Sequence, residues 1–400
     1  MTHPTTPNLS SVVACVLAAL SLGGCVTSTT SVASSSPDSS TPTATAVAAP
    51  ASVPTPSVTS PAAPATSVTA ELTPRSFDLT RSDIVAFIDD VSKRHGWPAE
   101  EVSALLSQGL HQPRIIAAIS RPAETVLKWW EYRERLVTTE RIARGVEFWN
   151  QHSERLVASA ERTGVDPAYI VAIIGIETNF GRNKGSWRVL DALMTLGFDY
   201  PPRQTFFRSE LEQFLLLVRE ERLDPLAVRG SYAGAMGAPQ FIPSSYRRFA
   251  VNGPGDGAAD ARRDLFDDWD DVIASVANYF TVHGWQRDEL VLVEVDAPAD
   301  TMATLDRRNL NLNTTIGALR TRGISIDASL ADTTEALLVP AELADRPNVR
   351  LGLRNFHVIT RYNRSILYAM AVHDLATAMR AARVDAPVRT DVTTDVTAAP

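Results

Sequence analysis

The stretch YIVAIIGIETNFGRNKG, residues 169–185, is an almost unbroken apolar run that contains a single carboxylate, Glu177. Asp166 and Pro167 precede the run, and an aspartate N-cap followed by a first-turn proline predicts the start of a helix. Gly181 interrupts the run and predicts that the helix ends near this residue. The stretch therefore predicts a helix with one acid close to its C-terminal end.

Glu177 shares a helical face with Ile170, Ile173 and Ile174, because residues at i, i+3, i+4 and i+7 point the same way. A glutamate is seldom buried without a role, although a residue at a helix end can also turn outward to solvent. Apolar neighbours and the negative end of the helix dipole both disfavour the charged form, so we expect the pKa of Glu177 to be raised. A carboxyl group that stays protonated near neutral pH can act as a general acid on a glycosidic oxygen.

The composition divides the chain into a part that can fold and two segments that cannot. Of the 400 residues, 44% are hydrophobic and 21% are charged, which is enough apolar material for one large core or two smaller ones. Residues 26–75 consist mainly of Ser, Thr, Pro, Ala and Val, and residues 385–400 are similar, so both are expected to be disordered. The formal net charge of −8, without any run of Lys and Arg, argues against a nucleic-acid partner.

Residues 1–25 have the features of a secretion signal. VVACVLAALSL, residues 12–22, is too short to span a bilayer and long enough for the apolar core of a signal peptide. The LGGC that follows resembles the lipobox of bacterial lipoproteins, which implies a lipid on Cys25 and a periplasmic location at a membrane, expected to be the outer membrane. An ordinary cleaved secretion signal is the alternative. If Cys15 and Cys25 both belong to this segment, the folded part has no cysteine and no thiolate metal site.

Apolar residues that recur every three or four positions predict a helical region over residues 76–165. A second, larger region is expected from 166 to 384, and short apolar runs bounded by Asp, Asn, Gly and Pro predict a small β-containing subdomain within it at about 290–354. We expect helical segments at 82–96, 100–110, 113–120, 123–136, 139–164, 271–284 and 366–382, and a helix pair at 205–223.

A glycine-rich segment, GSYAGAMGAPQFIPSSY, covers residues 230–246. Gly230, Gly234 and Gly237 would let the backbone approach an extended ligand closely, because glycine has no side chain in the way. Glycine-rich sequence is more often a plain loop, so this segment alone does not define a site.

The segment FHVITRYNRSILYAMAV, residues 356–372, places Tyr362 and Asn363 before a helix that carries Tyr368. Aromatic rings beside amide groups suit sugars, because a ring packs on the apolar face of a sugar while an amide bonds its hydroxyl groups. Within ILYAMAV, a tyrosine is also a common core residue, and that alternative stays open.

Taken together, these segments resemble the lytic murein transglycosylase B family. The resemblance is carried by GIETNFG, LDALMTLGFDYPPR, GSYAGAMGAPQFIPSSY, SVANYFTVHGW and VITRYNRSILYAMAV, and by AISRPAETVLKWWEYRERL and GVEFWNQH nearer the N-terminus. It runs in order from about Phe77 to Met379. It implies a mainly α chain with a lysozyme-like catalytic core, an N-terminal helical region and a small inserted β-containing subdomain.

The resemblance implies cleavage of the β-1,4 bond between MurNAc and GlcNAc in peptidoglycan, with a 1,6-anhydromuramoyl end as the product. Glu177 matches the single catalytic acid of the family. One carboxylate is sufficient there because the nucleophile belongs to the substrate, unlike in glycosidases with two carboxylates. The residues that match the cleft lining of the family are Ser231, Gln240, Tyr279, Tyr362, Asn363 and Tyr368, with Tyr132 and Arg203 for outer subsites.

Some members of this family carry a calcium loop where this chain reads VNGPGDGAADARRDLFDDWDDV, residues 251–272. Here Asn252 stands at the first ligand position, Pro254 and Ala258 offer no side-chain oxygen, and only Asp256 clearly survives. We therefore expect no metal and no other cofactor, and interpret the acids mainly as a solvated loop and a helix start. No peptidoglycan-binding repeat follows, and a monomer targeted by its anchor and its cleft is expected.

Two other functions remain open on the sequence alone. A hydrolytic muramidase would need a second carboxylate near the first, for which Asp199 or Glu210 could serve. A lipoprotein that only grips peptidoglycan would need no acid at all, and the intact motif around Glu177 argues against it.

Overall fold

The computed structural model describes residues 72–120, 127–253, 262–298 and 300–384. The expected signal peptide with Cys25, nearly all of the expected linker, the C-terminal tail and Asp256 of the acidic loop lie outside these ranges. No helix among the described residues is long and apolar enough to cross a membrane.

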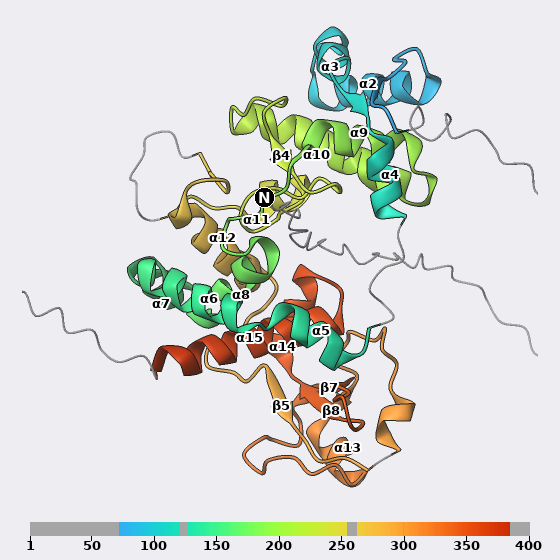
Figure 1. The fold of residues 1–400 in the computed structure, drawn as a ribbon. Coiled ribbons are helices and arrows are strands. Elements are labelled where there is room, and N and C mark those ends of the chain that lie inside the picture. Colours follow the sequence, from blue (N-terminus) through green and yellow to red (C-terminus); the bar gives the residue numbers. More distant parts are fainter. Residues whose placement is uncertain (1–71, 121–126, 254–261, 299, 385–400) are drawn as a thin grey trace, which may run out of the picture. The chain divides into compact units, whose positions relative to one another are not determined.

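The described chain is mainly helical, which confirms the predicted fold class (Figure 1). Its N-terminal part contains one small antiparallel ladder, β1 (Arg75–Ser76) with β2 (Leu110–His111), and a series of helices. These helices are α2 (Ser82–His95), α3 (Ala99–Leu106), α4 (Pro113–Ile119), α5 (Trp129–Leu136), α6 (Thr139–Gln151) and α7 (Ser153–Thr163). The segment 139–164, expected to be helical throughout, is thus two helices that separate at His152, whose φ of −113° is not helical.

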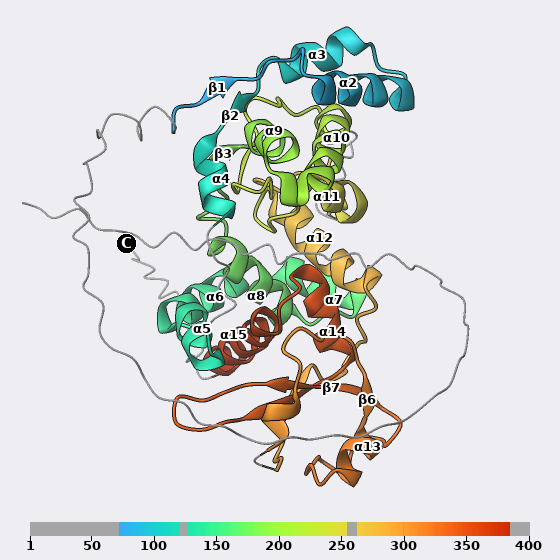
Figure 2. The ribbon, with the colours of Figure 1, turned by 90° about the vertical axis from the view of Figure 1, so that its right-hand side faces the viewer.

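The central part begins with the helix predicted around Glu177. Asp166 caps it by accepting a hydrogen bond from the Ala168 amide at 2.9 Å, and Pro167 occupies its first turn, as the sequence predicted. The elements of this part are α8 (Pro167–Thr178), β3 (Trp187–Arg188), α9 (Val189–Asp199), a 3-10 turn η1 (Pro201–Arg203), α10 (Gln204–Glu220), β4 (Arg229–Gly230), α11 (Pro243–Phe249) and α12 (Trp269–Val282). The expected helix pair at 205–223 is wrong, since this stretch forms the single helix α10, whose packing partner is α9 (Figure 2).

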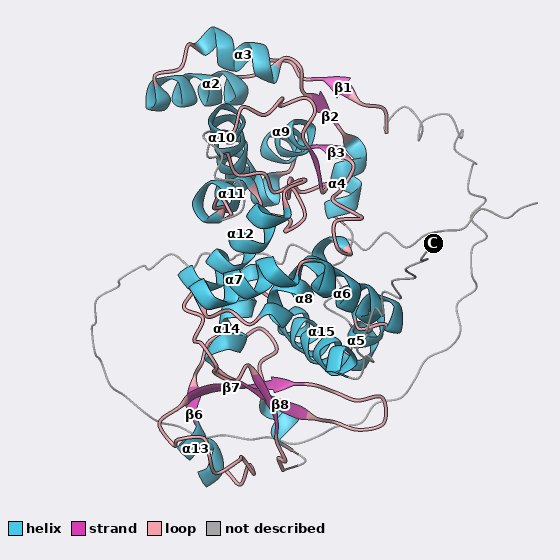
Figure 3. Ribbon diagram, turned by 90° about the vertical axis from the view of Figure 1, so that its left-hand side faces the viewer, coloured by secondary structure: helices cyan, strands magenta, loops and turns pink. Residues whose placement is uncertain are grey.

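The expected β-containing subdomain is a four-stranded antiparallel sheet in the order β5-β8-β7-β6 (Figure 3). Leu338 lies opposite Leu351 in its central pair. The elements are β5 (Leu292–Glu294), a 3-10 turn η2 (Thr301–Thr304), β6 (Thr314–Thr315), α13 (Ile316–Thr321), β7 (Glu335–Pro340) and β8 (Val349–Gly352). The helices α14 (Arg354–Tyr362) and α15 (Ile366–Val384) then complete the described chain.

The helices predicted as one N-terminal region contact two different parts of the chain. α4 and β2 lie against α9, and Arg81 reaches Asp199 at the end of α9 with an N–O distance of 2.7 Å. α5 and α6 instead pack against α15, and α7 packs against α12. One hydrophobic core runs from Ile84 to Met379, and the β-subdomain has a smaller core of its own around Leu351.

Candidate active site

The predicted acid, Glu177, lies in the last turn of α8, a helix that is buried on nearly all sides. Ile170, Ile173 and Ile174, which share a face with Glu177, are buried, and apolar residues also cover the other faces of this helix. Glu177 itself is half-buried. Its chemical setting is thus apolar along the helix and open at the helix end.

Tyr368 of α15 reaches Glu177 directly. Its hydroxyl group donates a hydrogen bond to Oε1 of Glu177 at 2.6 Å. The two helices lie side by side (Figure 1), and Tyr368 is only 3% exposed. The sequence left open whether Tyr368 is a core residue or a site residue. The structure shows a buried ring whose hydroxyl group reaches the predicted acid, and a role in the site stays a prediction.

The opposite end of the α8–α15 interface holds a second tyrosine bond. The Tyr169 hydroxyl oxygen lies 2.8 Å from Nδ1 of His373. Burial raises the pKa of Tyr169 and lowers the pKa of His373 to about 4. Both groups are therefore neutral at neutral pH, and at this end of the interface a buried tyrosine contacts a half-buried histidine.

Thr178, directly after the acid, fixes the end of α8. Its hydroxyl group donates to the Ala238 carbonyl oxygen at 2.9 Å and accepts from the Gly181 amide at 3.0 Å. Asn179 then ends the helix in the left-handed conformation, with φ of 50°. The sequence analysis did not single out Thr178, and its place next to the acid in GIETNFG was the available signal. This threonine ties the acid to the glycine-rich segment.

Ser231 and Gln240, two of the predicted lining residues, shape that segment from within. The Ser231 hydroxyl oxygen accepts from the amides of Ala233 and Ala235 at 3.2 and 3.1 Å. The Gln240 amide donates to the carbonyl oxygens of Lys184 and Gly237 at 3.1 and 2.9 Å. Both side chains are half-buried, so they stabilise the loop while remaining partly open to a ligand.

The glycines of the segment are required by the protein's own packing. Gly234 and Gly237 have φ of +83° and +71°, which side chains rarely adopt. A Cβ atom at Gly234 would lie 2.6 Å from the Leu193 side chain, and one at Gly237 would lie 2.4 Å from the Leu265 carbonyl oxygen. The packing of the loop is therefore sufficient to explain why glycine stands at these positions, without the approach of a ligand.

Tyr279 and Tyr362 form an aromatic pair beside this segment, with ring centroids 4.8 Å apart. The Tyr362 hydroxyl group donates to the Pro239 carbonyl oxygen at 2.6 Å, and Tyr362 is half-buried. Tyr279 is 7% exposed and donates to the Arg361 carbonyl oxygen at 2.6 Å. Tyr279 therefore supports Tyr362 from beneath, and only Tyr362 offers a ring with substantial exposure.

Tyr362 and Asn363 lie before the helix that carries Tyr368, as the sequence predicted, since this helix is α15. Tyr362 is also the last residue of α14, and Asn363 is the C-cap of that helix. The two outer candidates lie elsewhere in the fold. Tyr132 is buried on α5, which packs against α15, and the Arg203 guanidinium group stacks 4.3 Å above the Phe206 ring.

The two carboxylates considered for a hydrolytic mechanism already have structural partners. Asp199 is ion-paired with Arg81 at 2.7 Å and lies 3.5 Å from His111. Glu210 accepts from the amide and the hydroxyl group of Ser244 at 2.9 and 2.7 Å. Burial raises the pKa of Glu210, and its 4% exposure leaves little access to a water molecule.

The acidic segment after the glycine-rich loop forms caps and turns. Asp268 caps α12 by accepting from the amides of Asp270 and Asp271, as the sequence predicted for a helix start. Asp271 accepts from the amides of Gly253 and Asp264 at 2.5 and 2.6 Å. Within the described ranges, no three His, Cys, Asp or Glu side chains are arranged to hold a metal ion.

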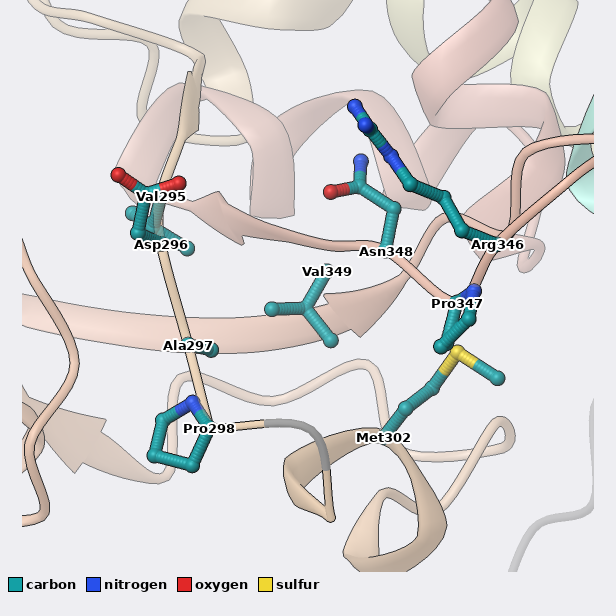
Figure 4. A pocket seen from close by; sticks show the side chains of 9 residues that line it. All are labelled: Val295, Asp296, Ala297, Pro298, Met302, Arg346, Pro347, Asn348 and Val349. Atoms are coloured by element: carbon teal, nitrogen blue, oxygen red, sulfur yellow. The ribbon is translucent and has the colours of Figure 1, made fainter.

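A hollow of about 260 Å³ lies in the β-subdomain (Figure 4). It is open and lined mainly by the end of β5, the turn η2 and the approach to β8. Its lining residues are Val295, Asp296, Ala297, Pro298, Met302, Arg346, Pro347, Asn348 and Val349. None of the predicted site residues belongs to it.

Comparison with known proteins gives this fold and this arrangement a context. A family model described as the transglycosylase SLT domain matches residues 80–377. The membrane-bound lytic murein transglycosylase B of Escherichia coli (strain K12) is 38% identical over 309 residues, which cover 74% of this chain and 82% of that protein.

Solved structures of lytic transglycosylases have a similar fold. The soluble lytic transglycosylase SltB1 of Pseudomonas aeruginosa is 44% identical and superimposes with a TM-score of 0.71, over 76% of this chain and 99% of that chain. The Escherichia coli lytic transglycosylase Slt35, solved in complex with calcium, is 38% identical with a TM-score of 0.69, over 77% and 96%. The predicted lysozyme-like core is thereby confirmed.

Proposed function

The chain belongs to the transglycosylase SLT domain family, and from this membership we propose that it cuts the MurNAc–GlcNAc β-1,4 bond of peptidoglycan without water, to leave a 1,6-anhydromuramoyl end. Lytic transglycosylase activity on murein follows from the family itself. The anhydro product and the residues that make it are the proposal.

Glu177 acts first as a general acid. It gives its proton to the GlcNAc oxygen as the bond from that oxygen to C1 of muramic acid breaks. The oxygen of the muramic acid C6 hydroxyl group then attacks C1, and the Glu177 carboxylate takes the proton that this oxygen loses. The enzyme returns to its initial state, and no water is consumed.

The bond from Tyr368 to Oε1 of Glu177 is the observation that carries this proposal. An oxygen that accepts a hydrogen bond is the less favourable place for the acid proton, so the proton lies on the other oxygen, Oε2. Tyr368 is then a positioning residue, which fixes the orientation of the carboxyl group. A raised pKa of Glu177 stays a prediction, since the donated bond opposes the effect of the apolar helix.

The glycan strand is held by groups on the loop and helix ends beside the acid. Tyr362 offers its ring face to a sugar, and Ser231, Gln240 and Asn363 offer polar groups for its hydroxyl and N-acetyl substituents. Their half-buried positions support this role. Tyr279 acts through Tyr362, and Tyr132 and Arg203 are assigned to outer subsites.

Mass spectrometry of the products from isolated sacculi tests the proposal, with the reaction run in ¹⁸O-labelled water. We expect muropeptides with anhydro ends, one water lighter than reducing ends, and no incorporation of ¹⁸O at C1. Labelled reducing ends would show a hydrolase and would return Asp199 and Glu210 to consideration. Undigested sacculi would leave only the function of a peptidoglycan-binding lipoprotein.

We also propose that the enzyme is a periplasmic monomer tethered through a lipid on Cys25. The name of the Escherichia coli relative, membrane-bound, supports a membrane location. As a flexible coil, the roughly 50-residue linker spans about 40 Å, and about 150 Å if its proline-rich parts extend. Cys25→Ala is expected to move the protein from the membrane fraction to the soluble fraction. If the variant still sediments with membranes, the lipid anchor is wrong.

A further inference from the structure

Helix α14 carries a line of basic side chains. Arg354, His357 and Arg361 are spaced at i, i+3 and i+7, so they share one face of the helix, and Arg364 follows directly after it. Arg354 is exposed, whereas Arg361 and Arg364 are half-buried. These four residues are called the basic line below.

The arginines of this line have no acidic partner within the part of the chain that the structure describes. The Nε and Nη2 atoms of Arg361 are also buried without a hydrogen-bond partner there. Another half-buried arginine, Arg141, also has a buried Nε atom without a partner, whereas Arg350 pairs with Asp374 at 2.8 Å. The buried atoms of Arg361 are out of reach of a ligand, but the exposed Arg354 and the half-buried Arg364 carry charges that an external anion can neutralise.

The two histidines near these arginines are held neutral. Nδ1 of His357 lies 2.8 Å from the Leu310 carbonyl oxygen, and Nδ1 of His283 lies 2.7 Å from the Tyr279 carbonyl oxygen. Burial, followed by the nearby guanidinium groups, keeps the pKa of both rings below its ordinary value. The positive charge of the line therefore comes from its arginines.

The basic line starts at the residues assigned to the glycan. Arg361 precedes Tyr362, and its carbonyl oxygen accepts the bond from Tyr279. His283 stacks on Tyr279 with ring centroids 4.2 Å apart, which extends the contact to α12. From Tyr362 back to Arg354 the helix rises about 12 Å. A peptide of four or five residues extends up to roughly 16 Å, so one attached to a muramic acid at Tyr362 can reach the whole line.

We propose that the basic line binds the carboxylate groups of the stem peptides that peptidoglycan carries on muramic acid. This inference rests on the proposed function, because it requires a glycan strand beside Tyr362. Guanidinium groups bind carboxylates through two parallel hydrogen bonds, which suits this ligand. An anionic lipid headgroup offers similar chemistry, but the net charge of −8 opposes the approach of the protein to an anionic bilayer.

The test compares two substrates, peptide-bearing glycan strands and strands stripped of peptides by an amidase. In the Cys25→Ala background, which removes the anchor, Arg354→Gln with Arg364→Gln should lower kcat/KM on peptide-bearing strands roughly 3- to 20-fold at low salt. Activity on stripped strands should not change. Arg114→Gln, an exposed arginine on α4, is the matched control and should affect neither substrate.

The results separate this inference from the proposed function. If the wild type cuts neither substrate, the proposed function fails. If the wild type cuts both substrates, the comparison with the double variant decides. An equal loss of activity on the two substrates, or no loss on either, would show that the stem-peptide site is wrong. A third result would favour a lipid headgroup. If the wild type binds phosphatidylglycerol vesicles, the double variant does not, and the preference between the two substrates is unchanged, the stem-peptide proposal is wrong. Equal melting temperatures of variant and control confirm that both are folded.

Discussion

The two ends of the α8–α15 interface use the same contact for different purposes. At each end a tyrosine of one helix bonds a titratable side chain of the other, Tyr368 to Glu177 and Tyr169 to His373. Glu177 and His373 are both half-buried, but Glu177 lies at the end of α8 beside the glycine-rich segment, whereas burial lowers the pKa of His373 to about 4. The comparison teaches that the bond alone does not make a site. The proposed site lies where the bonded group has an acidic proton to give and polar loop residues beside it, and we expect the bond at His373 to contribute to stability only.

Glu177→Gln is expected to have the largest effect on activity of all the substitutions considered. The amide keeps the size and hydrogen-bonding capacity of the side chain but has no proton to give, so release of anhydromuropeptides should fall by roughly 10²- to 10⁴-fold. Thermal melting should stay at or above the wild-type temperature, since a partly desolvated carboxyl group is replaced by a neutral one.

A matched control for this substitution is Glu212→Gln, because Glu212 is a buried glutamate that bonds His95 at 2.7 Å. We expect the control to lose stability and to keep its activity. Substantial turnover by Glu177→Gln would contradict the catalytic assignment.

The bond at His373 should affect how the free energy of unfolding depends on pH. The folded pKa of His373 is about 4, below the ordinary value of 6.5. Below pH 6.5 the unfolded chain gains a proton that the folded chain does not. The contribution of His373 is therefore complete above pH 6.5 and falls by roughly 3 kcal/mol as the pH decreases to about 4.

Urea unfolding of the wild type and of His373→Gln at several pH values measures this contribution. The difference between the two proteins isolates His373 from the other histidines. The variant should lose less stability than the wild type between pH 6.5 and 4, with unchanged product at neutral pH. Identical slopes for the two proteins would show that His373 titrates normally.

Tyr368→Phe tests the role of the hydrogen bond to Glu177. Removing the hydroxyl group leaves the ring and its packing in place but frees the carboxyl group to rotate, so kcat should fall roughly 10-fold, and KM should change little. The alkaline limb of the pH–rate profile, where Glu177 loses its proton, should also move to higher pH, because the donated bond that stabilises the carboxylate is lost. Tyr169→Phe, which removes the bond to His373, is the matched control, and a similar loss of kcat in this variant would remove the distinction between the two ends.

Removal of metal ions is expected to have the smallest effect. Asp268 and Asp271 already accept backbone hydrogen bonds, and the Asn252 amide donates to the Arg262 carbonyl oxygen at 3.1 Å. A site filled at 100 times its dissociation constant would add about 2.7 kcal/mol to stability. EGTA should therefore leave the melting temperature nearly unchanged. A fall of many degrees, reversed by calcium, would place this chain with the calcium-bound relative Slt35.

Local signals in the sequence predicted much of the fold. The Asp-Pro start of α8 and the span of α15 follow from residues that are neighbours in the chain. The short ladders and the break at His152 depend on contacts between distant segments, which no local pattern contains. The burial of the isoleucines that share a face with Glu177 agrees with the sequence pattern, but periodicity did not show which segments cover the other faces of α8.

The candidate site was predicted as a set of residues but not as an arrangement. The motif around Glu177 identified the acid, and the resemblance supplied Tyr368, but neither showed that the two are hydrogen-bonded. Thr178 and the basic line of α14 were missed. To recognise them, one must know which groups each side chain contacts in the fold. Thr178 bonds a carbonyl oxygen from a distant segment, and Arg361 has no acidic partner among the described residues.

The bond between Tyr368 and Glu177 joins residues that are 191 positions apart, and it also sets when the enzyme can begin to work. Contacts between such distant positions form late in folding, because the intervening chain must first be ordered. In the proposed export the N-terminus emerges first, so α8 is present before α15. Under the proposed mechanism a chain that ends before α15 carries the acid without the residue that orients it, and we expect cell-wall cutting to start only once α15 is in place.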